Sequence, residues 1–213
     1  MNAYDLETVK FIKSLLENIP REISHETMKD WIDNPEALQN ALRSVLCLPE
    51  VNPKKRFPKW KKIEIGTRTL TDLSNAILNG KFKIGHFVHD LLRNTEITAV
   101  KAEIELVNIS LLELGFRNGA ILAQIYAVAS EFGLALVPSE VGPQLLLNYP
   151  DQPLGESLII GMEPMLDNED DPRLFRIVRD SAQRLTTCEG CYTRHWQAKD
   201  RWVFARKRPT IVS

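Results

Sequence analysis

Apolar residues recur every three or four positions along the first part of the chain, a spacing typical of amphipathic helices. The pattern predicts a first helix that Pro20 ends. Ser24 is a suitable N-cap for a second helix, and the Asn-Pro pair at 34–35 marks the start of a third. We therefore expect residues 1–48 to form a helical arm.

Beyond the arm the pattern changes to short strands mixed with helices. The expected strands are 63–65, 103–114, 134–137, 144–149, 156–162, 174–178, 183–187 and 202–205, and the expected helices are 69–78, 87–92 and 118–132. Residues 103–137 thus read as strand, helix, strand, a βαβ-like unit, and the later strands form an antiparallel meander. Helices first and strands later predict an α+β fold with one mixed sheet.

Prolines and basic residues are concentrated between the arm and the strands, which predicts a linker at 49–62, a body at 63–208 and a tail at 209–213. The basic residues alternate with Phe57 and Trp60, as in proteins that bind single-stranded nucleic acid. Nucleic acid is therefore a possible partner through Lys54, Lys55, Arg56, Lys59, Lys61 and Lys62. The net charge of −1 gives no general reason to expect nucleic acid or a membrane.

Composition excludes several classes of protein. Apolar residues make up 44% of the 213 residues and charged residues 26%, as in globular proteins. No apolar run approaches the ~20 residues that cross a bilayer. The N-terminus does not resemble a secretory signal, and three cysteines do not suggest a disulfide framework, so we expect a cytoplasmic protein. The glycine-rich phosphate-binding motifs and the hydrolase motif Gly-x-Ser-x-Gly are absent from the sequence.

Four short motifs lie between residues 113 and 156: Glu-Leu-Gly-Phe at 113–116, Gly-Ala at 119–120, Glu-Val-Gly-Pro at 140–143, and Asp-Gln-Pro with Gly-Glu at 151–156. With these motifs the chain resembles a family of uncharacterised bacterial proteins over about residues 60–204. The resemblance implies that the body is a self-contained domain, and it implies no activity, cofactor or catalytic residue.

Three carboxylates are candidates for catalysis. Glu113 ends the first strand of the βαβ-like unit and Glu140 follows the second, so both belong to one sheet edge. A hairpin of 144–149 with 156–162 would return Glu163 to the same edge, near Arg117. Such a cluster could bind a divalent metal or divide acid and base roles. The alternative is that these are ordinary charges at strand ends and in a loop.

A second candidate is the turn that follows. Pro150 and Pro153 fix its backbone, so that Tyr149, Asp151, Gln152 and Glu156 are presented from a rigid base, which favours binding. The alternative is a simple proline-set turn in which Asp151 bonds its own backbone. Six strand residues between the Glu140 loop and this turn would separate the two groups by about 20 Å.

Histidine and cysteine residues offer a third candidate. Cys188 and Cys191 have the spacing of a zinc knuckle, and His195 follows at a suitable distance. A fourth ligand would have to come from Cys47, His25, His86 or His89. A redox dithiol and a plain hairpin turn with two cysteines are the alternatives. His86 and His89 could also share a helix face as metal ligands.

The sequence is compatible with two functions. The first is a macromolecule-binding module that uses the Pro150–Glu156 turn and the arm, in which deletion of residues 1–48 leaves a folded body with weaker association. The second is a carboxylate-based hydrolase or transferase at Glu113, Glu140 and Glu163. In that case Glu140→Gln abolishes activity and changes stability by no more than about 1 kcal/mol, as at a surface position.

Overall fold

The computed structural model describes residues 23–45, 48–49, 52 and 57–206. The chain divides into two compact units, Met1–Cys47 and Leu48–Ser213. The helix expected before Pro20 and the tail 209–213 lie outside the described residues, as do Lys54, Lys55 and Arg56.

The described part of the arm consists of two helices, α2 (His25–Asp33) and α3 (Pro35–Val45). The Ser24 side chain accepts a hydrogen bond from Thr27 N at 3.1 Å, so the predicted N-cap is confirmed. No side chain that the structure describes between residues 23 and 44 is buried, and Ile32 is 78% exposed. The described part of the arm therefore lacks a core of its own.

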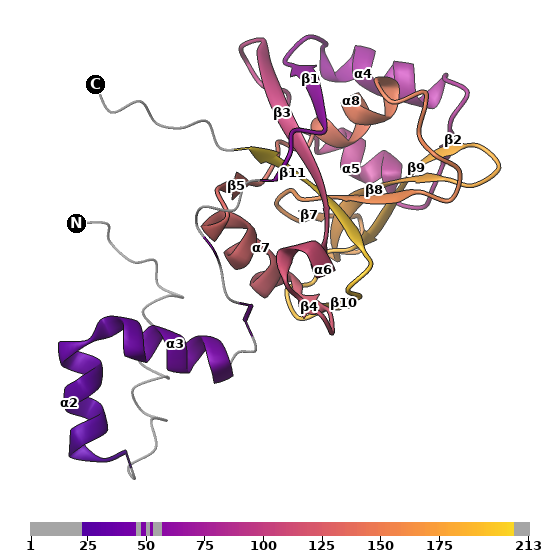
Figure 1. Ribbon diagram of the computed structural model, residues 1–213. Coiled ribbons are helices and arrows are strands. Elements are labelled where there is room, and N and C mark those ends of the chain that lie inside the picture. Colours follow the sequence, from indigo (N-terminus) through magenta and orange to yellow (C-terminus); the bar gives the residue numbers. More distant parts are fainter. Residues whose placement is uncertain (1–22, 46–47, 50–51, 53–56, 207–213) are drawn as a thin grey trace. The chain divides into compact units, whose positions relative to one another are not determined.

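The body is an α+β fold built on one mixed sheet, as predicted (Figure 1). Its helices are α4 (Leu70–Leu78), α5 (Val88–Arg93), α6 (Leu111–Leu114), α7 (Leu122–Glu131) and α8 (Val141–Leu147). Its strands are β1 (Lys61–Ile65), β2 (Lys83–Ile84), β3 (Ala102–Ser110), β4 (Ala120–Ile121), β5 (Leu134–Ala135), β6 (Ser157–Ile160), β7 (Met165–Leu166), β8 (Pro172–Arg179), β9 (Gln183–Glu189), β10 (His195–Trp196) and β11 (Arg201–Arg206).

The main sheet has the order β1-β3-β11-β6-β8-β9-β2, while β4 and β10 pair separately. The pairs β11–β6 and β2–β9 are parallel, and β6, β8 and β9 form the antiparallel meander. Both β3 and β5 run antiparallel to β11, so they are parallel to each other with α7 between them in sequence. This arrangement is the βαβ-like unit that the sequence predicts.

Helices cover both faces of this sheet. Residues paired across strands share a face, so Trp202 and Ile159 lie on one face, and Phe175, whose strand neighbour Arg176 pairs with Ile159, lies on the other. The Tyr126 ring of α7 meets the Trp202 ring edge-on, with centroids 6.2 Å apart. On the opposite face α8 lies so close to the sheet that a Cβ on Gly142 would be 2.8 Å from Phe175. Trp202 and Phe175 are both fully buried between the layers.

The strand expected at 144–149 is wrong, because Val141–Leu147 forms α8. Every residue from Val141 to Leu146 is buried. The pattern of apolar residues around the leucines at 145–147 therefore shows neither the helical nor the strand period. The hairpin expected between 144–149 and 156–162 therefore does not exist, and β6 pairs with β8 and β11 instead.

Three other boundaries differ from the expectation. The strand expected to reach residue 114 ends at Ser110, because Ser110 and Glu113 form a capping box that starts α6. The helix expected from residue 118 begins at Leu122, because Ala120–Ile121 pairs with β10. The end of the expected linker belongs to the body, because Phe57 is buried against Phe132 with ring centroids 5.2 Å apart. None of the helices in the described ranges has the length and apolar character that a membrane span requires.

Candidate functional site

Glu140 is fully buried and connects three parts of the body through hydrogen bonds. Its two carboxylate oxygens accept hydrogen bonds from the backbone N–H groups of Gly66 at 3.0 Å and Thr98 at 2.7 Å. Gly66 follows β1 and Thr98 precedes β3, so one side chain ties two loops to the start of α8. A carboxylate whose oxygens both accept backbone hydrogen bonds serves as a structural brace.

The other two candidate carboxylates have different surroundings. Glu113 completes the α6 capping box and lies 3.4 Å from the Arg201 guanidinium, with about half of its side chain exposed. Glu163 is exposed and accepts a hydrogen bond from the Tyr192 hydroxyl at 3.2 Å. Neither contact involves the loops that Glu140 joins.

The structure does not bring these three carboxylates together. The partners of Glu140 lie around the start of β3, whereas Glu113 lies just beyond its end. The nine residues of β3 span about 26 Å at ~3.3 Å per residue. Among the residues that the structure describes, no three His, Cys, Asp or Glu side chains are placed to hold a metal ion. The expected shared site at one sheet edge is therefore not formed.

The zinc-knuckle residues are also dispersed over different environments. Cys188 lies within β9, where its thiol donates to Leu174 O at 3.8 Å and burial raises its pKa to about 12. Cys191 follows the strand, and hydrogen bonds from Thr193 lower the pKa of its thiol. His195 is exposed in β10. Both described cysteines are free, and they form no metal-ligand group with His195 in the described part of the chain.

The turn at Tyr149–Glu156 is braced from three sides. Gly155 N donates to Arg179 O at 2.7 Å, and Arg179 N donates back to Glu156 O at 3.0 Å, which fixes the turn to the end of β8. The Arg179 guanidinium donates to Pro150 O at 2.8 Å. The Gln183 side chain of β9 donates to Tyr149 O at 2.5 Å. Together with two prolines these bonds make the turn a rigid element.

Two candidate binding residues of the turn point inward. Gln152 is 2% exposed, and its side-chain nitrogen donates to Glu156 O at 3.3 Å. The Tyr149 ring is buried edge-on against Trp60, with centroids 5.1 Å apart, and Lys61 Nζ lies 4.2 Å from the ring centroid. Burial and the neighbouring Glu156 carboxylate raise the pKa of Tyr149 above its usual range. These side chains support the turn and are not free for a partner.

The outer side of the turn carries an apolar tip and one charge. Leu154 is 79% exposed, among the most exposed large apolar side chains of the described residues. Gly155 adopts a positive φ of 82°, which lets the chain reverse immediately after Leu154. The Asp151 carboxylate, 76% exposed, lies 3.6 Å from Lys61 Nζ. Arg117, expected near the candidate carboxylates, is exposed in the loop between α6 and β4.

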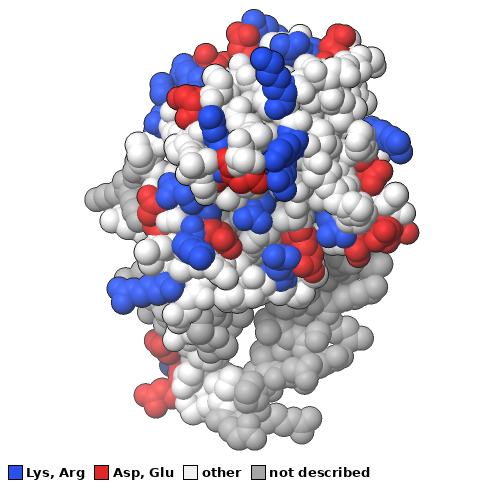
Figure 2. All heavy atoms as spheres, turned by 90° about the vertical axis from the view of Figure 1, so that its right-hand side faces the viewer, with Lys and Arg blue, Asp and Glu red and all other residues white. Residues whose placement is uncertain are grey.

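Two described lysines of the basic segment, Lys61 and Lys62, are paired with acidic or aromatic groups, whereas Lys59 is exposed. Lys62 contacts Glu103 at 2.5 Å and Glu105 at 3.8 Å across β1 and β3. Lys61 contacts Asp151 and the Tyr149 ring. On the face shown in Figure 2, basic side chains are interspersed with acidic ones and do not form one large basic patch. This face therefore gives little support to nucleic-acid binding.

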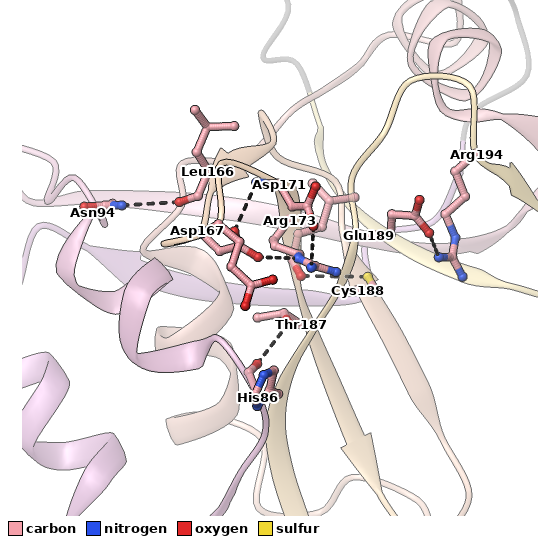
Figure 3. A network of polar contacts seen from close by, with 12 residues as sticks. His86, Asn94, Leu166, Asp167, Asp171, Arg173, Thr187, Cys188, Glu189 and Arg194 are labelled. Carbon is pink, nitrogen blue, oxygen red and sulfur yellow. Dashed lines mark hydrogen bonds and ion pairs between the residues drawn. The ribbon is translucent and has the colours of Figure 1, made fainter.

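One buried polar network is centred on Asp167 (Figure 3). Asp167 accepts hydrogen bonds from Glu169 N at 2.8 Å, Asp171 N at 3.0 Å and Arg173 Nε at 2.7 Å. Burial alone would raise the pKa of Asp167, but the bonds from Arg173 and the two amides outweigh it and lower the pKa. The Arg173 guanidinium also lies 4.5 Å from the ring centroid of Phe87.

This network fixes the β7–β8 turn to the start of α5. Phe87 has a positive φ of 58°, rare for a bulky residue, and the contact with Arg173 helps to hold it there. His86 precedes the N-cap Phe87, whereas His89 lies inside α5. The expectation that the two histidines share a helix face is therefore wrong. The four acidic residues among 167–171 are the only local signal for this network, because Phe87 is distant in sequence.

Comparisons with models of protein families, with curated proteins and with solved structures found no match to this chain. The resemblance to a bacterial family stays a prediction.

Proposed function

We propose that this protein is a cytoplasmic macromolecule-binding module that contacts its partner through the Pro150–Glu156 turn. The observation that supports this proposal is an apolar tip, Leu154, held 79% exposed on a turn braced by β8 and β9. Such an element is already ordered before binding, so association costs little conformational entropy. The partner surface that fits it has an apolar depression beside a basic group that can meet Asp151.

The arm supplies a second, separate surface for association. Its described side chains are all at least partly exposed, and Met28, Ile32 and Leu42 are 39%, 78% and 41% exposed. Apolar side chains of an amphipathic helix are stabilised when a partner covers them. We expect a chain that starts at Leu48 to remain folded, because Leu48 packs on the core of the body and is retained. This chain should associate more weakly, because it lacks the exposed apolar side chains of the arm.

Site-specific photocrosslinking tests the role of the turn. A benzophenone amino acid replaces Leu154 in one variant and Val100, which is 74% exposed, in a matched control. We expect a defined crosslinked product, identified by mass spectrometry, from position 154 and not from position 100. The product must also decrease when an excess of unlabelled wild-type chain competes, and must persist when the competitor carries Leu154→Ser. Identical products at both positions, or none at 154, would contradict the proposal.

The geometry does not favour the hydrolase or transferase alternative. That function requires Glu113, Glu140 and Glu163 to share one site, and their contacts place the first two around opposite ends of β3. The Glu140 carboxylate is in addition fully buried and bonded to two backbone N–H groups, so it is out of reach of a substrate.

A further inference from the structure

A pocket of about 320 Å³ lies between α7, the segment around β5 and the inner part of β11. Its wall is largely apolar and includes Ala129, Leu134, Leu136 and Phe204. The volume falls at the lower end of the ~300–1,000 Å³ that is usual for small-molecule sites. The turn at 149–156 contributes no side chain to this lining, so the pocket is separate from the proposed docking surface.

The pocket is preformed by fixed contacts. The Tyr126 hydroxyl donates to Met162 O at 2.5 Å, which locks the phenol ring as one side of the wall. The same ring lies edge-on to Phe204, with centroids 6.3 Å apart. The opposite side is held by backbone pairing, because Ala135 of β5 is in register with Ala205 of β11. A ligand would therefore enter a site that needs no rearrangement.

One charged side chain, Glu163, completes the lining. Its described partner is the hydroxyl of Tyr192 at 3.2 Å, and a phenol leaves the negative charge of the carboxylate uncompensated. Burial and, after it, the charge of Glu163 raise the pKa values of Tyr126 and Tyr192. The pocket thus combines an apolar interior with a negative potential at one side, which attracts a cation attached to an apolar body.

We propose that this pocket binds a small organic amine, with the apolar part of the ligand against Phe204 and Leu134 and the ammonium group paired with Glu163. The apolar wall would supply burial and the carboxylate would supply selection for positive charge. An organic acid of the same size would be repelled, and a neutral analogue would lose the ion pair.

Calorimetry with 2-phenylethylamine, 2-phenylethanol and phenylacetate tests this proposal on the full chain. We expect the amine to bind at least tenfold more tightly than the alcohol, and phenylacetate not to bind. Glu163→Gln should reduce amine binding to the level of the alcohol. The control Glu169→Gln removes an exposed carboxylate outside the pocket and should leave amine binding unchanged. Methyl NMR signals of Leu134 and Leu136 should shift with amine and not with phenylacetate.

A second variant keeps the proposal testable if Glu163→Gln alters the fold. Ala135 is half-buried and lines the pocket, so the larger side chain of Ala135→Leu should fill the pocket. This variant should bind neither the amine nor the alcohol. Equal affinities for amine and alcohol, or an unchanged affinity in Glu163→Gln, would overturn the assignment. Binding that appears only after removal of residues 207–213 would also overturn it, because the occupant of the pocket would then be this chain's own segment.

Discussion

The loop that enters α8 and the turn that leaves it are both polar, yet they use their side chains differently. Before the helix, Glu140 is fully buried and bonded to the backbone of Gly66 and Thr98. After the helix, the side chain of Gln152 and the backbone of the turn form hydrogen bonds that hold the turn in place. Leu154 and Asp151 face outward. The same short helix therefore connects a structural brace to a presented surface.

The difference shows that charge in a loop does not by itself indicate a site. A carboxylate whose oxygens accept backbone N–H groups is part of the fold, because removing it leaves buried donors unsatisfied. An exposed apolar side chain on a rigid turn contributes little to folding and is available to a partner. Substitutions in the two loops should therefore separate into effects on stability and effects on association.

The largest effect is expected for Glu140→Gln. The amide group of glutamine offers one acceptor oxygen where the carboxylate offers two, so one part-buried backbone N–H loses its partner. We expect the free energy of unfolding to fall by about 3 kcal/mol, as measured by urea denaturation. This differs from the change of no more than about 1 kcal/mol expected for a surface position. The control Glu96→Gln alters an exposed carboxylate nearby and should change the free energy by less than about 0.5 kcal/mol.

A second inward-facing carboxylate, Asp167, gives a prediction about pH. Its pKa is lowered in the folded protein from the usual 3.8, so its ionised form contributes stability above that pH. This contribution decreases as the pH falls below about 4, through the usual aspartate range toward the lowered value. Asp167→Asn should therefore lower the melting temperature at pH 7, and the difference from wild type should shrink between pH 4 and pH 2. A difference that stays constant down to pH 2 would show that the charge of Asp167 plays no part.

The sequence predicted the α+β class, the βαβ-like unit and most strands because alternation and caps are local signals. It failed at α8, because the three leucines at 145–147, of which the first two are buried and the third is partly buried, carry no periodicity. It also placed Glu140 in a catalytic cluster, because its partners lie 74 and 42 residues away and no local pattern announces them. The rigid turn was recognisable from its prolines, but Leu154 as its exposed tip became evident only in the structure.

An intermediate effect is expected within the turn itself. Gln152→Ala removes the bond to Glu156 O and the weaker contact with Gln183 at 3.5 Å. We expect the free energy of unfolding to fall by about 1 kcal/mol. Hydrogen exchange at the Gly155 amide should accelerate, because the turn loses part of its bracing. Unchanged exchange at Gly155 would mean that the two prolines alone keep the turn rigid.

The smallest effect on stability is expected for Asp151→Asn. The ion pair with Lys61 is 3.6 Å long and the Asp151 side chain is 76% exposed, so solvent screens most of the attraction. We expect the free energy of unfolding to change by less than about 0.5 kcal/mol. Because the fold is preserved, any loss of the crosslinked product at position 154 in this variant would report recognition by the partner. That loss should be larger at low salt than at high salt if Asp151 meets a basic group. If the crosslinking yield at position 154 is the same with and without Asp151→Asn at every salt concentration, Leu154 is the only specific contact of the turn.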